Sequence, residues 1–221
     1  MSESLLTLQG VRVAIQGADV LRGVSLDVPR GGLVALVGRN GAGKTTTLRS
    51  VMGLLPLSAG NINIDGTDLT EVPAFQRARL GIGYVPEDRR LIGRLSVTDN
   101  LLLPVWTGSA ADASRRIEQI YTLMPDLAVL SSRRAAQLSG GQQKMAALAR
   151  ALMSATKLLL LDEPFEGLSP GMGEKLAATI RQVQRTGLSI LVAESDVKRV
   201  GFVERTYTIE RGEIVQEIAA A

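Results

Sequence analysis

Leu33-Val34-Ala35-Leu36-Val37, followed directly by Gly38-Arg39-Asn40-Gly41-Ala42-Gly43-Lys44-Thr45, is the stretch that decides the fold of this 221-residue chain. The first five residues are continuously apolar, which is typical of a strand buried on both faces of a sheet. The next eight match the phosphate-loop pattern G-x-x-x-x-G-K-[ST] without a mismatch. Residues 46–54 favour a helix, so the predicted order is strand, glycine-rich loop and helix.

This order makes the glycine-rich loop a candidate cradle for a chain of phosphates. Its glycines let backbone N–H groups turn inward around an anion, and the following helix adds its positive N-terminal end. Lys44 would place its charge on the β- and γ-phosphates, and the Thr45 hydroxyl is a potential Mg²⁺ ligand. We expect nucleotide contacts from Gly38, Arg39, Asn40, Gly41, Ala42, Gly43, Lys44, Thr45 and Thr46.

A second apolar run, Leu158–Asp162, ends in an acid and is followed by Glu163. Because ligands of open α/β sheets bind at the carboxyl ends of strands, we expect Asp162 to hold Mg²⁺ directly or through water. Glu163 is then the candidate base that orients or deprotonates an attacking water. The sequence contains no histidine and no cysteine, which excludes zinc fingers, thiol nucleophiles and histidine bases and leaves this role to a carboxylate.

The remaining chain alternates strands with helices, which predicts an α/β sheet. Alternating apolar residues from Leu6 to Ile15 and from Val24 to Val28 indicate antiparallel strands near the start. Further strands are expected at 61–65, 83–85 and 189–194, helices at 97–103, 110–124, 142–153 and 173–184, and a hairpin at 206–217. We interpret residues 1–221 as a single domain, with a core over about 1–85 and 154–221 and a helical segment over about 86–153.

The composition narrows the class of protein. Apolar residues make up 45% and charged residues 21%, enough for a buried core, and no apolar run reaches the roughly 18 residues of a membrane span. Residues 1–10 lack the basic and apolar stretches of a signal peptide. Aromatic residues are only 3% and the net charge is only +3, so we expect no nucleic acid partner. The densest basic cluster is interpreted as a solvated face, with a protein partner or an anionic membrane as alternatives: Arg77, Arg79, Arg89, Arg90 and Arg94.

A third motif, Leu138-Ser139-Gly140-Gly141-Gln142, opens a predicted helix about 20 residues before Asp162. Alone it is an ordinary helix entry with Ser139 as N-cap. After a phosphate loop and before Leu158–Asp162, it resembles the ATP-binding-cassette (ABC) transporter ATPases, and the resemblance covers nearly the whole chain. It implies a P-loop NTPase (RecA-like) core with an antiparallel β subdomain and an α-helical insertion.

The resemblance also implies an ATPase that uses ATP and Mg²⁺. Members act as head-to-tail homodimers or paralogous heterodimers, in which each ATP lies between the phosphate loop of one copy and the SGGQ segment (Ser139, Gly140, Gly141 and Gln142) of the other. ATP closes the dimer and hydrolysis opens it, which drives integral membrane permease subunits. The expected location is the cytoplasmic face of a bacterial inner membrane, reached through those permease subunits.

Three stretches, 83–90, 94–101 and 162–170, look like the ATPase subunits of bacterial importers for branched-chain and other hydrophobic amino acids. Urea, amide or lipid systems are alternatives. Residues 91–106 are expected to contact the permease, and Trp106 is interpreted as core of the helical segment. Two other functions stay open: a clamp that binds ATP and hardly hydrolyses it, and a cassette ATPase that acts on DNA or ribosomes.

Four positions depart from the family pattern. Glu87 stands where most members have a glutamine that touches Mg²⁺, and its carboxylate is a competent ligand, so we keep it as a metal and catalytic candidate. Ile15, or alternatively Gln16, stands where an aromatic residue usually stacks on adenine, which predicts weaker or base-indifferent nucleotide binding. Ser169 replaces the usual aspartate of a dimer-contacting loop.

The fourth departure is Ser195, which stands where a histidine normally reaches the γ-phosphate. Removing one preorganised donor from a developing charge costs about 2.7–4 kcal/mol in other enzymes. We retain Ser195 as a catalytic candidate beside Glu163, Lys44 and Glu87. Because Glu163 and Lys44 are intact, we predict slow but real ATP hydrolysis.

Overall fold

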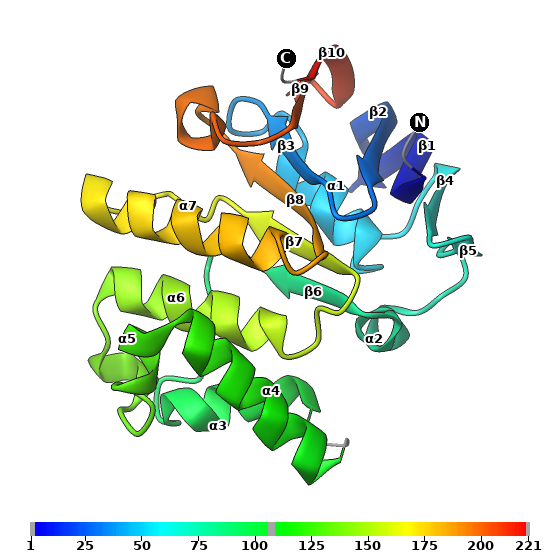
Figure 1. Cartoon of the computed structure of the whole chain (residues 1–221). Coiled ribbons are helices and arrows are strands. Elements are labelled where there is room, and N and C mark those ends of the chain that lie inside the picture. The colour runs from blue at the N-terminus through cyan, green and yellow to red at the C-terminus, as the bar shows by residue number, and fades with distance from the viewer. Residues whose placement is uncertain (1–2, 106–108, 220–221) are drawn as a thin grey trace.

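The computed structural model describes residues 3–105 and 109–219, so the prediction for Trp106 lies outside the described residues. The described residues form an antiparallel sheet and a mainly parallel sheet with helices around them (Figure 1). The antiparallel sheet has the strand order β2-β1-β4-β5. Its strands are β1 (Ser4–Ile15), β2 (Ala18–Pro29), β4 (Ala59–Ile64) and β5 (Thr67–Asp68).

The parallel sheet positions the candidate site. Its order is β10-β9-β3-β8-β7-β6, with only β10 antiparallel to its neighbour. The strands are β3 (Leu33–Val37), β6 (Ile82–Val85), β7 (Leu158–Asp162), β8 (Ser189–Glu194), β9 (Arg205–Glu210) and β10 (Glu213–Ala219). Because β3, β6, β7 and β8 run the same way, the segments that follow them all leave the sheet at one edge.

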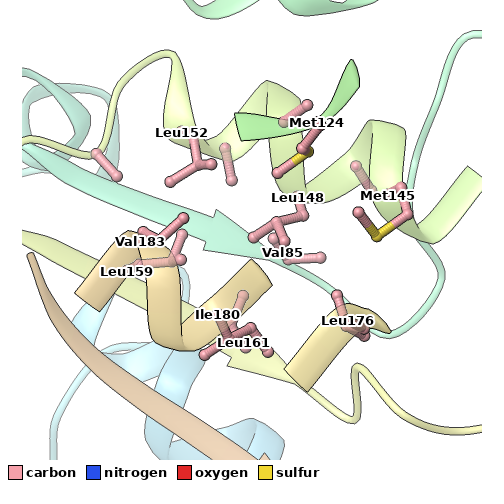
Figure 2. Close-up of a cluster of buried hydrophobic side chains, with 14 of the residues drawn as sticks. Val85, Met124, Met145, Leu148, Leu152, Leu159, Leu161, Leu176, Ile180 and Val183 are labelled. Carbon is pink, nitrogen blue, oxygen red and sulfur yellow. The ribbon is translucent and has the colours of Figure 1, made fainter. Parts of the chain in front are cut away.

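Two apolar cores flank the parallel sheet because its central strands are buried on both faces. Along β7, Leu159 and Leu161 face one core while Leu158 and Leu160 face the other. Figure 2 shows the first core, where side chains of α6 (Gly140–Leu152) and α7 (Pro170–Gln184) meet those of β7. The second core packs α1 (Lys44–Val51) and the antiparallel sheet against the opposite face.

The helices between β6 and β7 lie at the end of the molecule opposite the antiparallel strands (Figure 1). They are α3 (Val97–Leu102), α4 (Ala110–Leu123), α5 (Pro125–Ala128) and α6, with 3₁₀ turns at Leu103–Val105 and Ala135–Gln137. Serine hydroxyls cap α3, α4 and α6, each accepting a bond from a backbone N–H in the first turn. The predicted α/β class with a helical insertion is confirmed.

Helix boundaries differ from the sequence prediction mainly at the starts. Helix α1 begins at Lys44 and ends at Val51, so the last two loop residues form its first turn. Helix α6 begins at Gly140 rather than 142, because Ser139 caps it. Helix α7 begins at Pro170 rather than 173, and proline is well tolerated in a first turn because no intrahelical N–H bond is lost there.

One member of the predicted basic face is buried. Arg77, in the short helix α2 (Ala74–Arg77), is only 5% exposed. Its guanidinium donates to the carbonyl oxygens of Ser50 and Val51 at the end of α1, at 2.9 and 2.8 Å, and to that of Leu69 at 2.6 Å. The interpretation of Arg77 as solvated is therefore wrong: it adds donors to carbonyl oxygens at the end of α1, of which that of Ser50 also accepts from Gly53 N at 3.0 Å.

Within residues 3–105 and 109–219, no helix combines the length and the apolar character needed to cross a bilayer.

Candidate functional site: a phosphate loop and two carboxylates at one sheet edge

The glycine-rich loop joins β3 to α1 at the carboxyl edge of the parallel sheet. Gly41 and Gly43 have φ of +81° and +115°, a region that side chains rarely adopt. A Cβ on Gly38 would lie 2.3 Å from the carbonyl oxygen of Ile209, and one on Gly43 would lie 2.8 Å from Leu21 Cδ2. The motif thus has glycine where the backbone must turn or approach a neighbour closely.

Lys44 is held at the centre of the loop. Its side chain is only 3% exposed, and its ammonium group lies 3.0 Å from a carboxylate oxygen of Glu163. The same Nζ donates to the carbonyl oxygen of Gly38 at 2.8 Å and to that of Arg39 at 3.3 Å. Two of the predicted catalytic residues, separated by more than a hundred positions in the sequence, therefore form a buried ion pair.

Asp162 lies beside the loop and accepts two hydrogen bonds. The Thr45 hydroxyl donates to Oδ1 at 2.9 Å, and the Tyr84 hydroxyl donates to Oδ2 at 3.0 Å. Burial raises the pKa of Asp162, and the two hydrogen bonds act in the opposite direction. Burial and the neighbouring Asp162 charge raise the pKa of Tyr84, which keeps the phenol protonated as a donor. Sequence reasoning did not single out Tyr84, which lies on β6 beside β7.

Glu163 adopts a left-handed backbone conformation, with φ of +47°. Such a conformation is uncommon for residues other than glycine and needs support from its surroundings. Its N–H donates to the carbonyl oxygen of Ala193 at 2.9 Å, and its own carbonyl accepts from Lys144 Nζ at 2.9 Å. Lys144 is buried, which lowers its pKa. The sequence offered no reason to select Lys144, since it follows the SGGQ segment in what reads as a plain helix.

A cavity of about 290 Å³ opens in front of the loop. Glu87 borders it, so the structure brings this candidate to the loop. Partial burial raises the pKa of Glu87, and the nearby charges of Glu166, Glu163 and Asp162 raise it further. Val20 and Glu166 also line the cavity and were not predicted. The lining residues are Val20, Asn40, Gly41, Gly43, Lys44, Thr45, Thr46, Glu87, Glu163 and Glu166.

Ile15 and Ser195 are among the predicted residues that do not line this cavity. Ile15 ends β1 and is 39% exposed, and Val20 on the next strand takes the place beside the loop. Ser195 follows β8, is exposed, and donates its backbone N–H to the carboxylate of Glu194 at 3.2 Å.

The SGGQ segment begins α6 and does not line the cavity in front of the phosphate loop. Gln142 N donates to the Ser139 hydroxyl at 3.3 Å, and Ser139 N donates to the Gln142 side-chain oxygen at 2.9 Å. This reciprocal pair is a capping box. Ser139 and Gly140 are exposed. One chain therefore presents the phosphate loop and the SGGQ segment as separate surfaces.

Comparison with known proteins decides the family. Residues 21–166 match the family model described as ABC transporter. The chain belongs to the ABC transporter family. This ABC chain is 37% identical to LptB of Escherichia coli K12, a lipopolysaccharide export system ATP-binding protein, over 95% of the chain and 88% of LptB. It is 36% identical to BraG of Pseudomonas aeruginosa, a high-affinity branched-chain amino acid transport ATP-binding protein, over 92% of the chain and 88% of BraG.

A solved structure places the fold in the same family. The ABC chain superposes on a dimeric ATP-binding cassette in a post-hydrolysis state bound to ADP and phosphate, with a TM-score of 0.86 and 25% identity. The match covers 97% of this chain and 98% of the other. The family predicted from the three motifs is confirmed, and the chain is an ATP-binding, ATP-hydrolysing ABC transporter subunit.

Proposed function

We propose that this single nucleotide-binding domain drives a membrane permease by hydrolysing ATP at the sheet edge, with Glu163 as the base. The observation that carries the proposal is the buried Glu163–Lys44 pair, at 3.0 Å, in front of the phosphate loop. When ATP binds, Lys44 contacts the β- and γ-phosphates, and these contacts replace some of its present hydrogen bonds to loop carbonyl oxygens. The Glu163 carboxylate is thereby released toward the position of the attacking water.

The donor set fits Mg²⁺. Thr45, Asp162 and Glu87 offer hard oxygen ligands, and Thr45 and Asp162 are already joined at 2.9 Å. The described residues contain no metal cage built from three or more acidic, histidine or cysteine side chains. Mg²⁺ needs none, since it is usually held by one or two carboxylates together with water and substrate phosphates. When bound, Mg²⁺ would neutralise charge on the β- and γ-phosphates.

The second half of each ATP site comes from a second ABC subunit. The exposed SGGQ segment offers the N-terminal end of α6, a 13-residue helix whose dipole favours an anion. It does not line its own chain's phosphate cavity, so a head-to-tail copy must supply it there. The pair acts on integral permease subunits and is held by them at the cytoplasmic face of a bacterial inner membrane.

Turnover is slow for the family and weakly selective for the base. Ser195 is too short to replace an imidazole directly, although a bridging water recovers part of the contact. At the base-binding end, Ile15 and Val20 offer aliphatic surface rather than an aromatic ring to stack on.

The transported substrate is a branched-chain or other hydrophobic amino acid, taken up by import. The stretches 83–90, 94–101 and 162–170 and the likeness to BraG support this. Lipopolysaccharide export is the second candidate, since LptB is as similar over the same part of the chain. Purification of the chain with its membrane partners separates the two, because the permease that accompanies it defines the transport system.

Glu163→Gln tests the assigned base. The change keeps the size of the side chain and removes its ability to accept a proton, so turnover should fall by at least about a hundredfold while ATP still binds. Steady-state phosphate release and nucleotide titration measure the two effects. Glu166→Gln is the matched control, since it neutralises another carboxylate lining the same cavity and should leave turnover nearly unchanged.

Two outcomes would contradict the proposal. Wild-type turnover in Glu163→Gln would remove Glu163 from the role of base. A wild-type protein that binds ATP but releases no phosphate, even with its permease, would be a clamp rather than a motor.

A further inference from the structure

A buried carboxylate lies at the end of β8, between two loops of the site. Glu194 is 0% exposed. One carboxylate oxygen accepts the backbone N–H of Phe165 at 2.9 Å, and the other accepts that of Ser195 at 3.2 Å. The nearest cation, on Arg199, lies 3.7 Å from the second oxygen. Glu194 therefore joins the loop after β7 to the loop after β8.

The ionised form of the Glu194 carboxylate is destabilised by its buried position. The other five residues of β8 are buried as well, and an ionised group buried among them costs free energy unless it is well paired. Burial raises the pKa of Glu194, and the negative Glu163 nearby adds to the rise. The hydrogen bonds from Phe165 and Ser195 and the charge of Arg199 offset only part of this.

The hydrogen bond from Phe165 N to Glu194 also restrains Glu163, which lies two residues earlier in the same loop. Glu163 N donates to Ala193 of β8 at 2.9 Å, so the loop is tied to β8 at position 163 and again at position 165. Phe165 also packs edge-on against Phe202, with ring centroids 5.9 Å apart. The left-handed backbone of Glu163 is thus held in place by hydrogen bonds at positions 163 and 165 and by the packing of Phe165.

We propose that Glu194 is a positioning residue, which holds the 163–165 loop so that the Glu163 carboxylate faces the phosphate loop, and which holds the backbone of Ser195 with the same side chain. The proposal rests on the role of Glu163 as base. It assigns Glu194 no contact with ATP.

The side chain of Glu194 should affect the rate of hydrolysis and leave nucleotide binding unchanged. Among the described residues, Glu194 is bonded to the phosphate loop through its main chain, whose carbonyl oxygen accepts from Gly38 N at 3.1 Å. Substitution of the side chain keeps that bond. Small displacements of a catalytic group commonly cost much of the rate, while Lys44 and the loop glycines keep their places.

The test measures kcat and KM for ATP in Glu194→Ala and Glu194→Gln. We expect Glu194→Ala to lower kcat by about tenfold to a hundredfold with KM within about twofold. Glu194→Gln keeps one acceptor oxygen for two N–H donors, so its kcat should fall less than that of the alanine variant. Thermal melting of each variant shows that the folded protein is compared.

Glu204→Ala is the matched control. The Glu204 carboxylate also binds a backbone N–H of the parallel sheet, that of Leu33 at 3.2 Å, and it accepts from Gln184 at 3.1 Å. It does so at the amino end of β3, away from the site, so its removal should leave kcat unchanged.

A Glu194→Ala protein with a lower Tm but wild-type kcat and KM would make Glu194 purely structural and overturn the proposal. If the alanine variant does not fold, wild-type kcat in Glu194→Gln overturns it, and reduced kcat at unchanged KM supports it. Glu163→Gln is assayed alongside. If that variant keeps wild-type turnover, the assigned base itself is wrong, which is a different failure.

Discussion

The two halves of the proposed nucleotide site are built differently within one chain. Around the phosphate loop, side chains from α1 and from the end of β7 and the residue after it are buried or partly buried and bonded to one another, as Lys44 is to Glu163 and Thr45 is to Asp162. At the SGGQ segment the polar groups are exposed, and Ser139 and Gln142 bond only within their own helix start. Folding of the chain brings the groups of the first half together. The second half is an exposed helix start whose polar side chains bond to backbone N–H groups of that same start.

Because of this difference, we expect ATP binding to depend mainly on the first half and ATP hydrolysis to depend on both. The phosphate loop and Lys44 can hold a nucleotide in a single chain, because every group they need is already in place. Hydrolysis is faster when the developing charge on the γ-phosphate is surrounded by donors, and in the proposed head-to-tail pair the second copy's SGGQ segment supplies them. Removing the phosphate-binding cation of the first half should therefore lower affinity, whereas changes in the second half should lower the rate at nearly unchanged affinity.

The largest effect is expected from Lys44→Ala. The change removes the cation that meets the phosphates and leaves the Glu163 carboxylate to repel them, so ATP affinity should fall by about a hundredfold or more. Isothermal titration measures it. Lys157→Ala, which removes an exposed lysine paired with Asp65, should leave the affinity unchanged. Equal ATP affinity in Lys44→Ala and wild type would contradict the assignment of the phosphate loop and Lys44 as the part that binds ATP.

Ser139→Ala should lower turnover by roughly tenfold while ATP affinity stays within about twofold, since it acts on the other half of the site. Ser96→Ala is the matched control. Ser96 forms a capping box with Asp99 at the start of α3, so both variants lose a similar cap, worth about 1 kcal/mol. A similar fall in turnover in both variants would mean that helix capping, rather than a contact with ATP, explains the loss.

The smallest effect is a dependence of stability on pH. Because burial raises the pKa of Glu194, the folded protein keeps a proton that the unfolded chain has already released, and its unfolding free energy falls as pH rises through the folded pKa. Glu194→Gln removes this loss. The Tm of the variant relative to wild type should therefore be higher at about pH 8 than at about pH 5.

The expected shift follows from the size of the chain, since each kcal/mol changes Tm by about 2–4 °C. Ser139→Ala alters no titratable group and should show the same Tm difference from wild type at both pH values. If the Tm difference between Glu194→Gln and wild type is also the same at both pH values, burial does not raise the pKa of Glu194 enough to affect stability, which would contradict the prediction.

The sequence was sufficient where a motif is contiguous. The phosphate loop, Asp162, Glu163 and the SGGQ segment could all be predicted, because each sits at the junction of a strand or helix with a loop. Tyr84, Lys144 and Glu194 could not, because their roles depend on which strands and helices lie side by side. Tyr84 reaches Asp162 only because β6 pairs with β7, and Glu194 reaches Phe165 only because β8 lies on the other side of β7.

Arg77 shows the same limit for burial. Its charge and local sequence favour a solvated position, yet two segments, at 50–51 and at 69–72, place carbonyl oxygens around its guanidinium. Such a site is set by tertiary packing alone, and no periodicity in the sequence indicates it.

The central claim is that the SGGQ segment of one copy faces the phosphate loop of another, and disulfide cross-linking tests it most directly. The chain has no cysteine, so engineered thiols are unambiguous. Asn40→Cys and Ser139→Cys are made separately in the Glu163→Gln background, both at exposed positions. They are oxidised alone or mixed, with and without ATP, and followed by non-reducing electrophoresis.

A head-to-tail pair brings the two different thiols together, as a disulfide requires. We predict a covalent dimer in the mixture with ATP, much less of it without ATP, and little in either variant alone. If the mixture forms no covalent dimer with ATP, or if Asn40→Cys alone forms as much as the mixture, the two halves of the site do not meet between copies in this way.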